Sequence, residues 1–124
     1  ERLDRLPEGV SRAEAEDIRE WDRGLLWSTL SHETPRPAAD DPAPVVDAAI
    51  GHIAATPSCL GLVSLEDMLG LDEQPNLPGT VDVHPNWRRR LAVPIAQLFD
   101  DPDFKRRCAI LTDTRQRAET AEPG

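Results

Sequence analysis

The chain has 124 residues, a formal net charge of −9 at pH 7 and a sequence pI near 4.7. This length suits one domain, and the acidity argues against a nucleic-acid partner, because binding to nucleic acid depends on Lys and Arg that neutralise phosphates. Hydrophobic residues make up 39% of the chain, as in a folded protein, while 12 prolines predict many loops.

Cysteine and histidine usage argues against a metal centre. Cys59 and Cys108 lie far apart and are expected to be free thiols in a reducing, cytoplasmic compartment. His32, His52 and His84 fall in separate segments without the close spacing of zinc ligands, so we predict no metal. There is no apolar run of about 18 residues and no leader, so no membrane association is expected.

The N-terminal third predicts one long helix followed by a loop. Ser11 and Glu14 have the three-residue spacing of a capping box, and a helix is expected over about 12–30. Its apolar residues recur at helical spacing and predict one buried stripe. We expect Trp21 and Trp27 to pack on this face, the alternative being that their rings stack on sugar. Four prolines within 31–44 predict a loop.

A second helix and a strand are predicted next. Asp41 and Pro42 are a typical helix start, and apolar residues from Val45 to Ile53 form one face of a helix that ends at "TPS", 56–58. Cys59 to Val63 is apolar almost without alternation, which favours a strand buried on both faces, near 59–64. Asp67 suits the start of a short helix that stops at Gly70.

The rest of the chain is again predicted to be helical, with a short piece over 91–99 and a last helix from Asp101 and Pro102 to about Ala118. A buried strand needs hydrogen-bonded neighbours, and the sequence offers none. We therefore predict an α/β chain, mostly helical, whose residues 1–124 form the closing part of a larger β/α architecture. The start at Glu1 rather than Met leads us to expect further residues upstream.

The stretch "NLPGTVDVHPNWRRRL", residues 76–91, follows the predicted strand and short helix. Pro78 and Gly79 predict a turn, since proline fixes its φ and glycine accepts a positive φ. The Asn76 amide suits either bracing the backbone or bonding a sugar hydroxyl. Trp87 is expected to pack rather than to stack on sugar. One of the three arginines, Arg88, is expected to pair with a buried acid, and His84 is not expected to act as a general base.

From Ser64 to Leu91, "SLEDMLGLDEQPNLPGTVDVHPNWRRRL" resembles the C-terminal signature of the 4-α-glucanotransferases, the amylomaltase or disproportionating-enzyme family of glycoside hydrolases. The resemblance implies a (β/α)8 barrel enzyme that passes α-1,4-glucan chains between maltooligosaccharides. Such retaining chemistry uses two carboxylates and a covalent glycosyl intermediate, and implies no cofactor. Weaker similarity covers most of the chain.

The family's catalytic carboxylates are expected upstream of this chain. "SHET", residues 31–34, only echoes the family's "THD"-like motif, since it follows a helix and not a strand. Glu66 and Asp67 are neighbours and cannot straddle one bond, so neither is assigned to catalysis. The resemblance instead places Glu66 and Asn76 beside the sugar as substrate-binding residues.

Two interpretations remain from the sequence. In the first, this is the C-terminal segment of a cytoplasmic 4-α-glucanotransferase, inactive alone, with an α-glucan and the remainder of the barrel as partners. In the second, it is a non-enzymatic helical interaction module, in which 59–63 is helical or satisfied within the chain. The state of the 59–63 backbone distinguishes the two interpretations.

Overall fold

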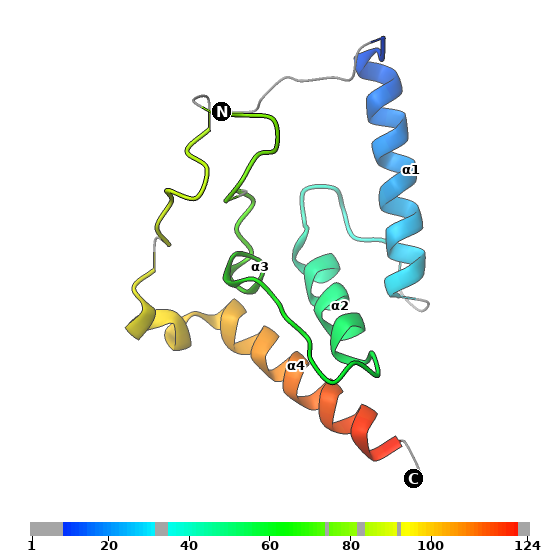
Figure 1. Cartoon of the computed structure of the whole chain (residues 1–124). Coiled ribbons are helices and arrows are strands. Elements are labelled where there is room, and N and C mark those ends of the chain that lie inside the picture. The colour runs from blue at the N-terminus through cyan, green and yellow to red at the C-terminus, as the bar shows by residue number, and fades with distance from the viewer. Residues whose placement is uncertain (1–8, 32–34, 74, 82–83, 92, 122–124) are drawn as a thin grey trace. The chain divides into compact units, whose positions relative to one another are not determined.

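The computed structural model describes residues 9–31, 35–73, 75–81, 84–91 and 93–121. The chain divides into two compact units, Glu1–Asp41 and Pro42–Gly124, and each is described by itself. Its elements, in chain order, are the helices α1 (Arg12–Leu30), α2 (Ala43–Ala54) and α3 (Leu65–Leu69), the 3₁₀ helix η1 (Ile95–Asp100) and the helix α4 (Pro102–Ala121), all seen in Figure 1.

The first unit is built on α1, and its predicted bounds are confirmed. The Ser11 Oγ accepts the N–H of Glu14 at 3.2 Å, as the capping motif predicts. Beyond the helix, Arg36 donates to the carbonyl of Glu20 at 3.4 Å and to its carboxylate, which returns the following segment to the helix. The hydrogen bonds that the Glu20 carboxylate accepts from Arg36 and from Arg23 hold its pKa below the usual value.

The predicted buried stripe of α1 is wrong for the described chain, because no residue of this helix is buried. Trp21 remains largely exposed and Trp27 is half-buried. The spacing of the apolar residues predicted the helix correctly. Their burial, however, requires a packing partner that the described residues of this unit do not supply.

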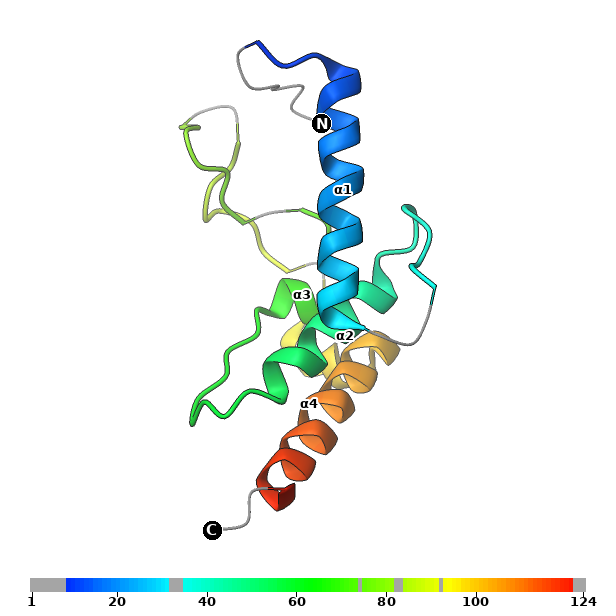
Figure 2. The ribbon, with the colours of Figure 1, turned by 90° about the vertical axis from the view of Figure 1, so that its right-hand side faces the viewer.

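The core of the second unit takes one side chain from each of four elements. Ile50 of α2, Met68 of α3, Leu98 of η1 and Phe104 of α4 form a single buried cluster. Figure 2 shows α2 and α4 crossing, with α3 beside them. The ring of Phe99 meets Phe104 edge to face, with ring centroids 5.5 Å apart, which adds an aromatic contact at the rim of the core.

A buried arginine links three of these helices. Arg107 of α4 is only 1% exposed, and its Nε donates to Asp47 Oδ1 of α2 at 2.8 Å. Its Nη1 donates to the carbonyl of Met68 in α3 at 3.0 Å. Gly70 ends α3 in the left-handed conformation, with φ 66°, and a Cβ there would lie 3.0 Å from the guanidinium. The predicted stop at Gly70 is therefore confirmed, and close approach of Arg107 is a second reason for glycine.

The helix starts agree with the sequence to different degrees. Asp101 caps α4, since its Oδ1 accepts the N–H of Phe104 at 2.9 Å, as the Asp-Pro pair predicts. At α2, Pro42 occupies the cap position without a side-chain hydrogen bond, and the helix begins one residue later, at Ala43. The helix end at Ala54 lies just before "TPS", as predicted.

The predicted α/β fold with a buried strand near 59–64 is wrong: the described residues contain helices and no strand. Leu60 and Leu62 are 70% and 81% exposed, so this segment is not buried. Within the described chain, the backbone of 59–63 makes no hydrogen bond to another backbone segment. A strand exists only through such bonds, and no described residues provide the second strand. None of the described helices has the length and apolar character of a membrane span.

Candidate functional site

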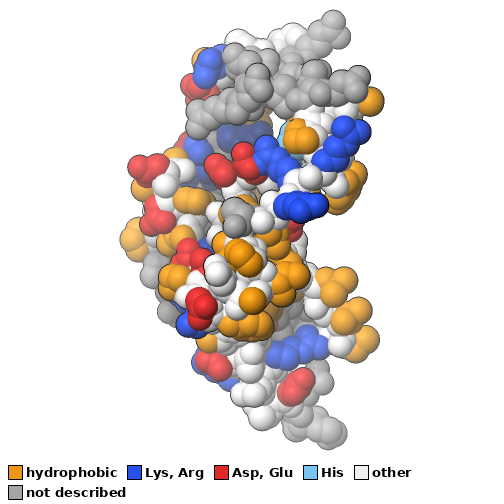
Figure 3. Space-filling model, turned by 90° about the vertical axis from the view of Figure 1, so that its left-hand side faces the viewer, with side chains coloured by type: hydrophobic (Ala, Val, Ile, Leu, Met, Phe, Trp, Pro, Cys, Tyr) orange, Lys and Arg blue, Asp and Glu red, His pale blue; other side chains and the backbone are white. Residues whose placement is uncertain are grey.

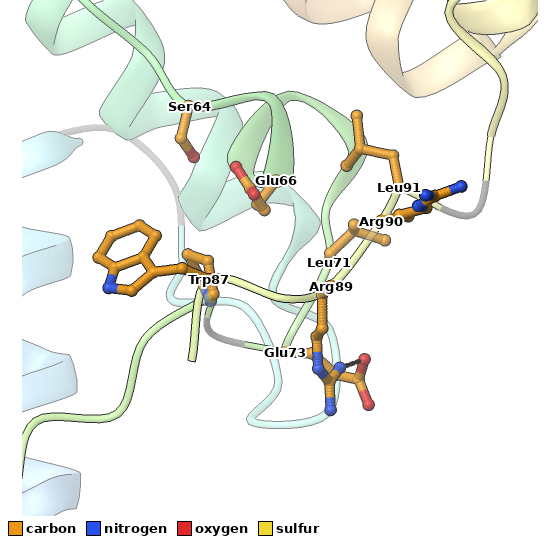
Figure 4. A pocket seen from close by; sticks show the side chains of 9 residues that line it. Ser64, Glu66, Leu71, Glu73, Trp87, Arg89, Arg90 and Leu91 are labelled. Atoms are coloured by element: carbon orange, nitrogen blue, oxygen red, sulfur yellow. Dashed lines mark ion pairs between the residues drawn. The ribbon is translucent and has the colours of Figure 1, made fainter. Parts of the chain in front are cut away.

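A cavity of about 500 Å³ lies between α3 and the loop that follows it. Its acidic and basic side chains are Glu66, Glu73, Arg89 and Arg90. Ser64 and Trp87 add a hydroxyl and an indole, and Leu71, Pro75 and Leu91 supply apolar surface. Figure 4 shows the side chains that surround this space. With two acidic and two basic groups, the cavity has no strong preference for a charged ligand.

The first wall of the cavity is α3, whose start is fixed by Ser64. The Ser64 Oγ accepts the N–H of Asp67 at 3.0 Å and donates to Asp67 Oδ2 at 2.8 Å. Ser64 is therefore the cap of α3, whereas Asp67, the predicted cap, lies within the first turn and accepts a hydrogen bond from the Ser64 hydroxyl. The Asp67 carboxylate is thus engaged, whereas the side chain of Glu66 has no hydrogen-bond or ion-pair partner among the described residues. Glu66 is therefore the available carboxylate at this wall.

The loop that forms the other wall contains the predicted Pro-Gly turn. The N–H of Thr80 donates to the carbonyl of Leu77 at 3.2 Å, and Gly79 has φ 78° between them. Proline at the second position and a glycine of positive φ at the third are the pattern of a type II turn. The Thr80 hydroxyl reinforces it by donating to the same carbonyl at 2.7 Å. The predicted turn is confirmed.

Asn86 closes the loop. Its Oδ1 accepts the N–H of Leu77 at 2.8 Å, and its Nδ2 donates to the carbonyl of Thr80 at 2.8 Å and to the Thr80 Oγ1 at 3.1 Å. One amide therefore joins both ends of the Pro-Gly turn across six to nine residues. This role of Asn86 was not predicted from the sequence, in which only Asn76 was considered as a residue that braces the backbone. The available signal was a second asparagine shortly after the turn, with no spacing rule to select it.

The two residues predicted to bind substrate are not brought together in the cavity. Glu66 lines it, while Asn76 lies nearby on the loop, half-buried and outside the lining. Within the described chain, the Asn76 side chain makes no hydrogen bond, so its amide does not brace the loop here. Its assignment as a sugar contact stays a prediction, as does that of Glu66.

Trp87 differs from expectation. Its side chain is 75% exposed rather than packed, and its backbone lies in the left-handed region, with φ 58°. Its N–H donates to the carbonyl of Pro75 at 2.9 Å, which holds this conformation. A non-glycine residue with positive φ is uncommon and persists only where the surroundings fix it. The cavity therefore has an aromatic side chain at its edge that the described unit does not cover.

The arginine run contributes a different pair from the one predicted. Arg89, not Arg88, pairs with an acid, and that acid is the largely exposed Glu73. The neighbouring Arg90 lines the cavity without a partner among the described residues. His52 is exposed on α2, away from the cavity lining. "SHET", with His32, lies outside the described residues except for Ser31.

No metal centre is found in the described part of the chain, where no three His, Cys, Asp or Glu side chains converge. Cys59 is an exposed free thiol, and Cys108 is a half-buried one that packs against the core cluster. Within the described chain, the chemistry available at the cavity is that of hydrogen bonding, one unpaired carboxylate from Glu66, one unpaired guanidinium from Arg90 and an aromatic face.

Comparison with known proteins decides the family. A family model described as 4-alpha-glucanotransferase matches residues 12–96, which is more than half of the chain and includes the whole cavity. The chain belongs to the 4-alpha-glucanotransferase family. The resemblance found in the sequence from Ser64 to Leu91 is thereby confirmed.

Curated members of the 4-alpha-glucanotransferase family are similar over much the same part of the chain. A 4-alpha-glucanotransferase of Mycobacterium bovis is 37% identical over 86 residues, covering 68% of this chain and 12% of the relative. Two proteins of that name from Mycobacterium tuberculosis strains match to the same extent. The match thus spans about an eighth of these relatives' length. No solved structure matches the chain.

Proposed function

We propose that this chain is the C-terminal part of a 4-α-glucanotransferase that transfers α-1,4-glucan chains between maltooligosaccharides. The observation that carries the proposal is the family match over residues 12–96, which spans α3, the braced loop and the cavity between them. Starch, glycogen and maltose are the materials that such an enzyme would work on. Its substrate would be an α-glucan, and the reaction would need no cofactor.

The proposed reaction is a retaining double displacement. One carboxylate attacks the anomeric carbon and expels the acceptor-side sugar, while a second carboxylic acid protonates the departing oxygen. The hydroxyl of an incoming sugar then gives its proton to that second group and displaces the enzyme carboxylate. Glu66 and Asp67 are neighbours in sequence, and the Asp67 carboxylate is engaged by Ser64 at the start of α3. These two carboxylates therefore cannot stand on opposite sides of one glycosidic bond, as the reaction requires. We therefore assign both reacting groups to residues upstream, so this chain alone is inactive.

The contribution of this chain in the proposal is substrate binding. Glu66 lines the cavity with an unengaged carboxylate, which can accept a hydrogen bond from a sugar hydroxyl. Asn76 stands on the same braced loop with an unengaged amide, which can both donate and accept. These two side chains are the proposed substrate-binding residues.

We propose that the segment 59–63 contacts the remainder of the same protein, a (β/α)8 catalytic barrel. Leu60 and Leu62 stand out from a segment whose backbone groups have no backbone partner within the described chain. Large exposed side chains on adjoining positions mark contact surfaces in many proteins. Figure 3 shows further apolar side chains gathered on one face. The free thiols fit a reducing compartment, so the enzyme is proposed to act in the cytoplasm.

The experiment incubates the full-length protein that contains this chain with maltotriose and separates the products. Glucose together with a ladder of longer oligosaccharides is the expected result, and the absence of that ladder would overturn the proposed activity. Asn76→Ala and Glu66→Gln should each raise the KM for maltotriose. Asp113→Asn is the control, since Asp113 is an exposed residue of α4 outside the family match. Variants that behave like this control would remove the two site assignments alone.

The alternative of a non-enzymatic helical module has one observation in its favour, the absence of strands from the described residues. It also requires the backbone N–H and carbonyl groups of 59–63 to have hydrogen-bond partners within the chain. That backbone has no hydrogen-bond partner from another segment of the described chain, and its leucines are exposed. The transferase is therefore the better-supported function.

A further inference from the structure

The side chain of Trp87 lies exposed at the edge of the cavity, on a loop that is otherwise tightly held. Three backbone hydrogen bonds fix the segment around it. The N–H of Trp87 donates to Pro75 at 2.9 Å, that of Arg88 to Pro85 at 3.1 Å, and that of Asn86 to His84 at 2.8 Å. With the Asn86 amide joining the turn, the indole stands on a preorganised support.

The second unit has its own core without Trp87. The buried cluster is made by Ile50, Met68, Leu98 and Phe104, and neither it nor the residues packed against it include the indole. Trp87 nevertheless keeps a left-handed backbone that is unfavourable for a side chain of this size. A held, exposed aromatic ring in a strained conformation at a cavity is typical of a residue that contacts a ligand.

The charges around the cavity indicate which ligand. Glu73 and Arg89 pair with each other, so neither is left for a ligand. Figure 4 shows the Glu66 carboxylate on the same side of the cavity as Ser64 and Trp87, with the Glu73–Arg89 pair on another side. The guanidinium of Arg90, which has no partner among the described residues, lies beside Leu91, on the far side of the lining from Trp87. The free charge next to the ring is therefore the Glu66 carboxylate, which disfavours an anion such as a phosphate there. A neutral sugar suits both Trp87 and Glu66, because a pyranose ring has an apolar face that can pack on the indole and hydroxyl groups that can donate to the carboxylate.

We propose that Trp87 and Glu66 together form a subsite for one glucosyl unit of an α-1,4-glucan, the indole stacking on the sugar ring and the carboxylate accepting a hydroxyl hydrogen bond. The volume of about 500 Å³ lies within the range of small-molecule sites. This inference rests on the proposed function and adds to it a stacking residue and its partner carboxylate.

The test replaces Trp87 in the full-length protein by residues that separate stacking from packing. Trp87→Phe keeps a flat aromatic face, whereas Trp87→Leu keeps apolar bulk without one. A stacking role predicts that Trp87→Leu raises the KM for maltooligosaccharide about tenfold with kcat within about twofold, while Trp87→Phe stays within about threefold of the parent KM. Val81→Ala is the matched control, since Val81 is an exposed apolar residue of the same loop that does not line the cavity.

Other outcomes are distinguishable. If Phe and Leu variants have the parental KM and only a lower melting temperature, Trp87 packs against another part of the protein, and the subsite is overturned while the activity stands. If the parent makes no product ladder, the proposed function fails, and the subsite is tested directly by calorimetric titration with maltotetraose. Equal binding by the parent and Trp87→Leu, or no binding by either, then overturns the subsite as well. Weaker binding by Trp87→Leu alone supports it.

Discussion

The helical core of the second unit and the loop over 75–91 are held together by different means. In the core, four elements each contribute a buried apolar side chain, and Arg107 joins α2 and α3 to α4. In the loop, the Asn86 amide makes three hydrogen bonds to Leu77 and Thr80. The core is therefore stabilised by buried apolar contacts, whereas the described part of the loop is held by backbone hydrogen bonds and by the amide of one side chain.

This difference has a consequence for the cavity, which takes one wall from each region. Glu66 is positioned by α3, a helix too short to be stable without tertiary contacts. Trp87 is positioned by the loop. Changes in the core should therefore affect stability first, and changes in the loop should affect ligand affinity first.

The largest effect is expected from Arg107→Ala. The substitution leaves Asp47 partly buried without one of its two guanidinium partners and leaves the Met68 carbonyl unbonded. Breaking a buried ion pair on one side costs about 3–5 kcal/mol of the free energy of unfolding. Chemical denaturation of the full-length protein measures this loss.

Arg117→Ala is the control for Arg107, because Arg117 is an exposed arginine of the same helix. Its expected change is within about 0.5 kcal/mol. An equal loss in both variants would mean that the buried hydrogen bonds of Arg107 contribute nothing specific to the core.

A smaller, local effect is expected from Asn86→Ala. The N–H of Leu77, the carbonyl of Thr80 and the hydroxyl of Thr80 lose their side-chain partner, at a local cost of about 1–3 kcal/mol. Amide hydrogen exchange at Leu77 should accelerate, while exchange in α4 should not. The KM for maltooligosaccharide should rise with little change in the melting temperature.

Asn86→Asp sharpens this comparison. Asp retains the oxygen that accepts from Leu77 but loses the donor to Thr80. The exchange rate at Leu77 and the KM of this variant should therefore lie between those of the parent and the alanine variant. Faster exchange throughout α4 in either variant would show that the loop and the core unfold as one unit and are not stabilised separately.

The sequence predicted the parts of both regions that depend on local patterns. Ser11, Gly70 and Asp101 mark helix ends through interactions within a few residues, and Pro78 with Gly79 marks a turn. The long-range contacts could not be predicted in the same way. Arg107 reaches Asp47 across 60 positions, and no local rule selects that arginine from its neighbours.

The apolar run at 59–63 shows the limit of such patterns. Its composition is that of a strand, but a strand also needs hydrogen-bonded neighbours, which no described residues supply. At the cavity, the resemblance pointed to Glu66, which lines the space, and its role in binding substrate stays a prediction. The exposure of Trp87 was not foreseen, because a tryptophan before a helical run is more often packed.

An acid-dependent loss of stability is the third expected effect. Burial by itself raises the pKa of Asp47, but hydrogen bonds from Arg106 and Arg107 outweigh it and leave the pKa below the usual value. Such a group stabilises the fold above its unfolded pKa, and the contribution is lost as pH falls through the lower folded value. Unfolding free energy should therefore decline as pH falls below about 4.

Asp47→Asn provides the comparison for this pH dependence. The amide cannot ionise, so the variant should be less stable near neutral pH and should show a weaker dependence on pH below about 4. The measurement is denaturant unfolding at a series of pH values. Parallel pH profiles for parent and variant would show that other carboxyl groups account for the acid sensitivity.

The smallest effect is expected at the start of α3, where the two regions meet. Ser64→Ala removes the hydroxyl that accepts the N–H of Asp67 and donates to its carboxylate, at a cost of about 1 kcal/mol. Ser64→Thr keeps both interactions and should restore stability. Because α3 also carries Glu66, the alanine variant should raise the KM slightly, and by less than Glu66→Gln does. A KM that rises in Ser64→Ala as much as in Glu66→Gln would instead indicate that the Ser64 hydroxyl contacts the sugar directly. The reason is that a loss of about 1 kcal/mol at the start of α3 leaves Glu66 correctly placed in most molecules.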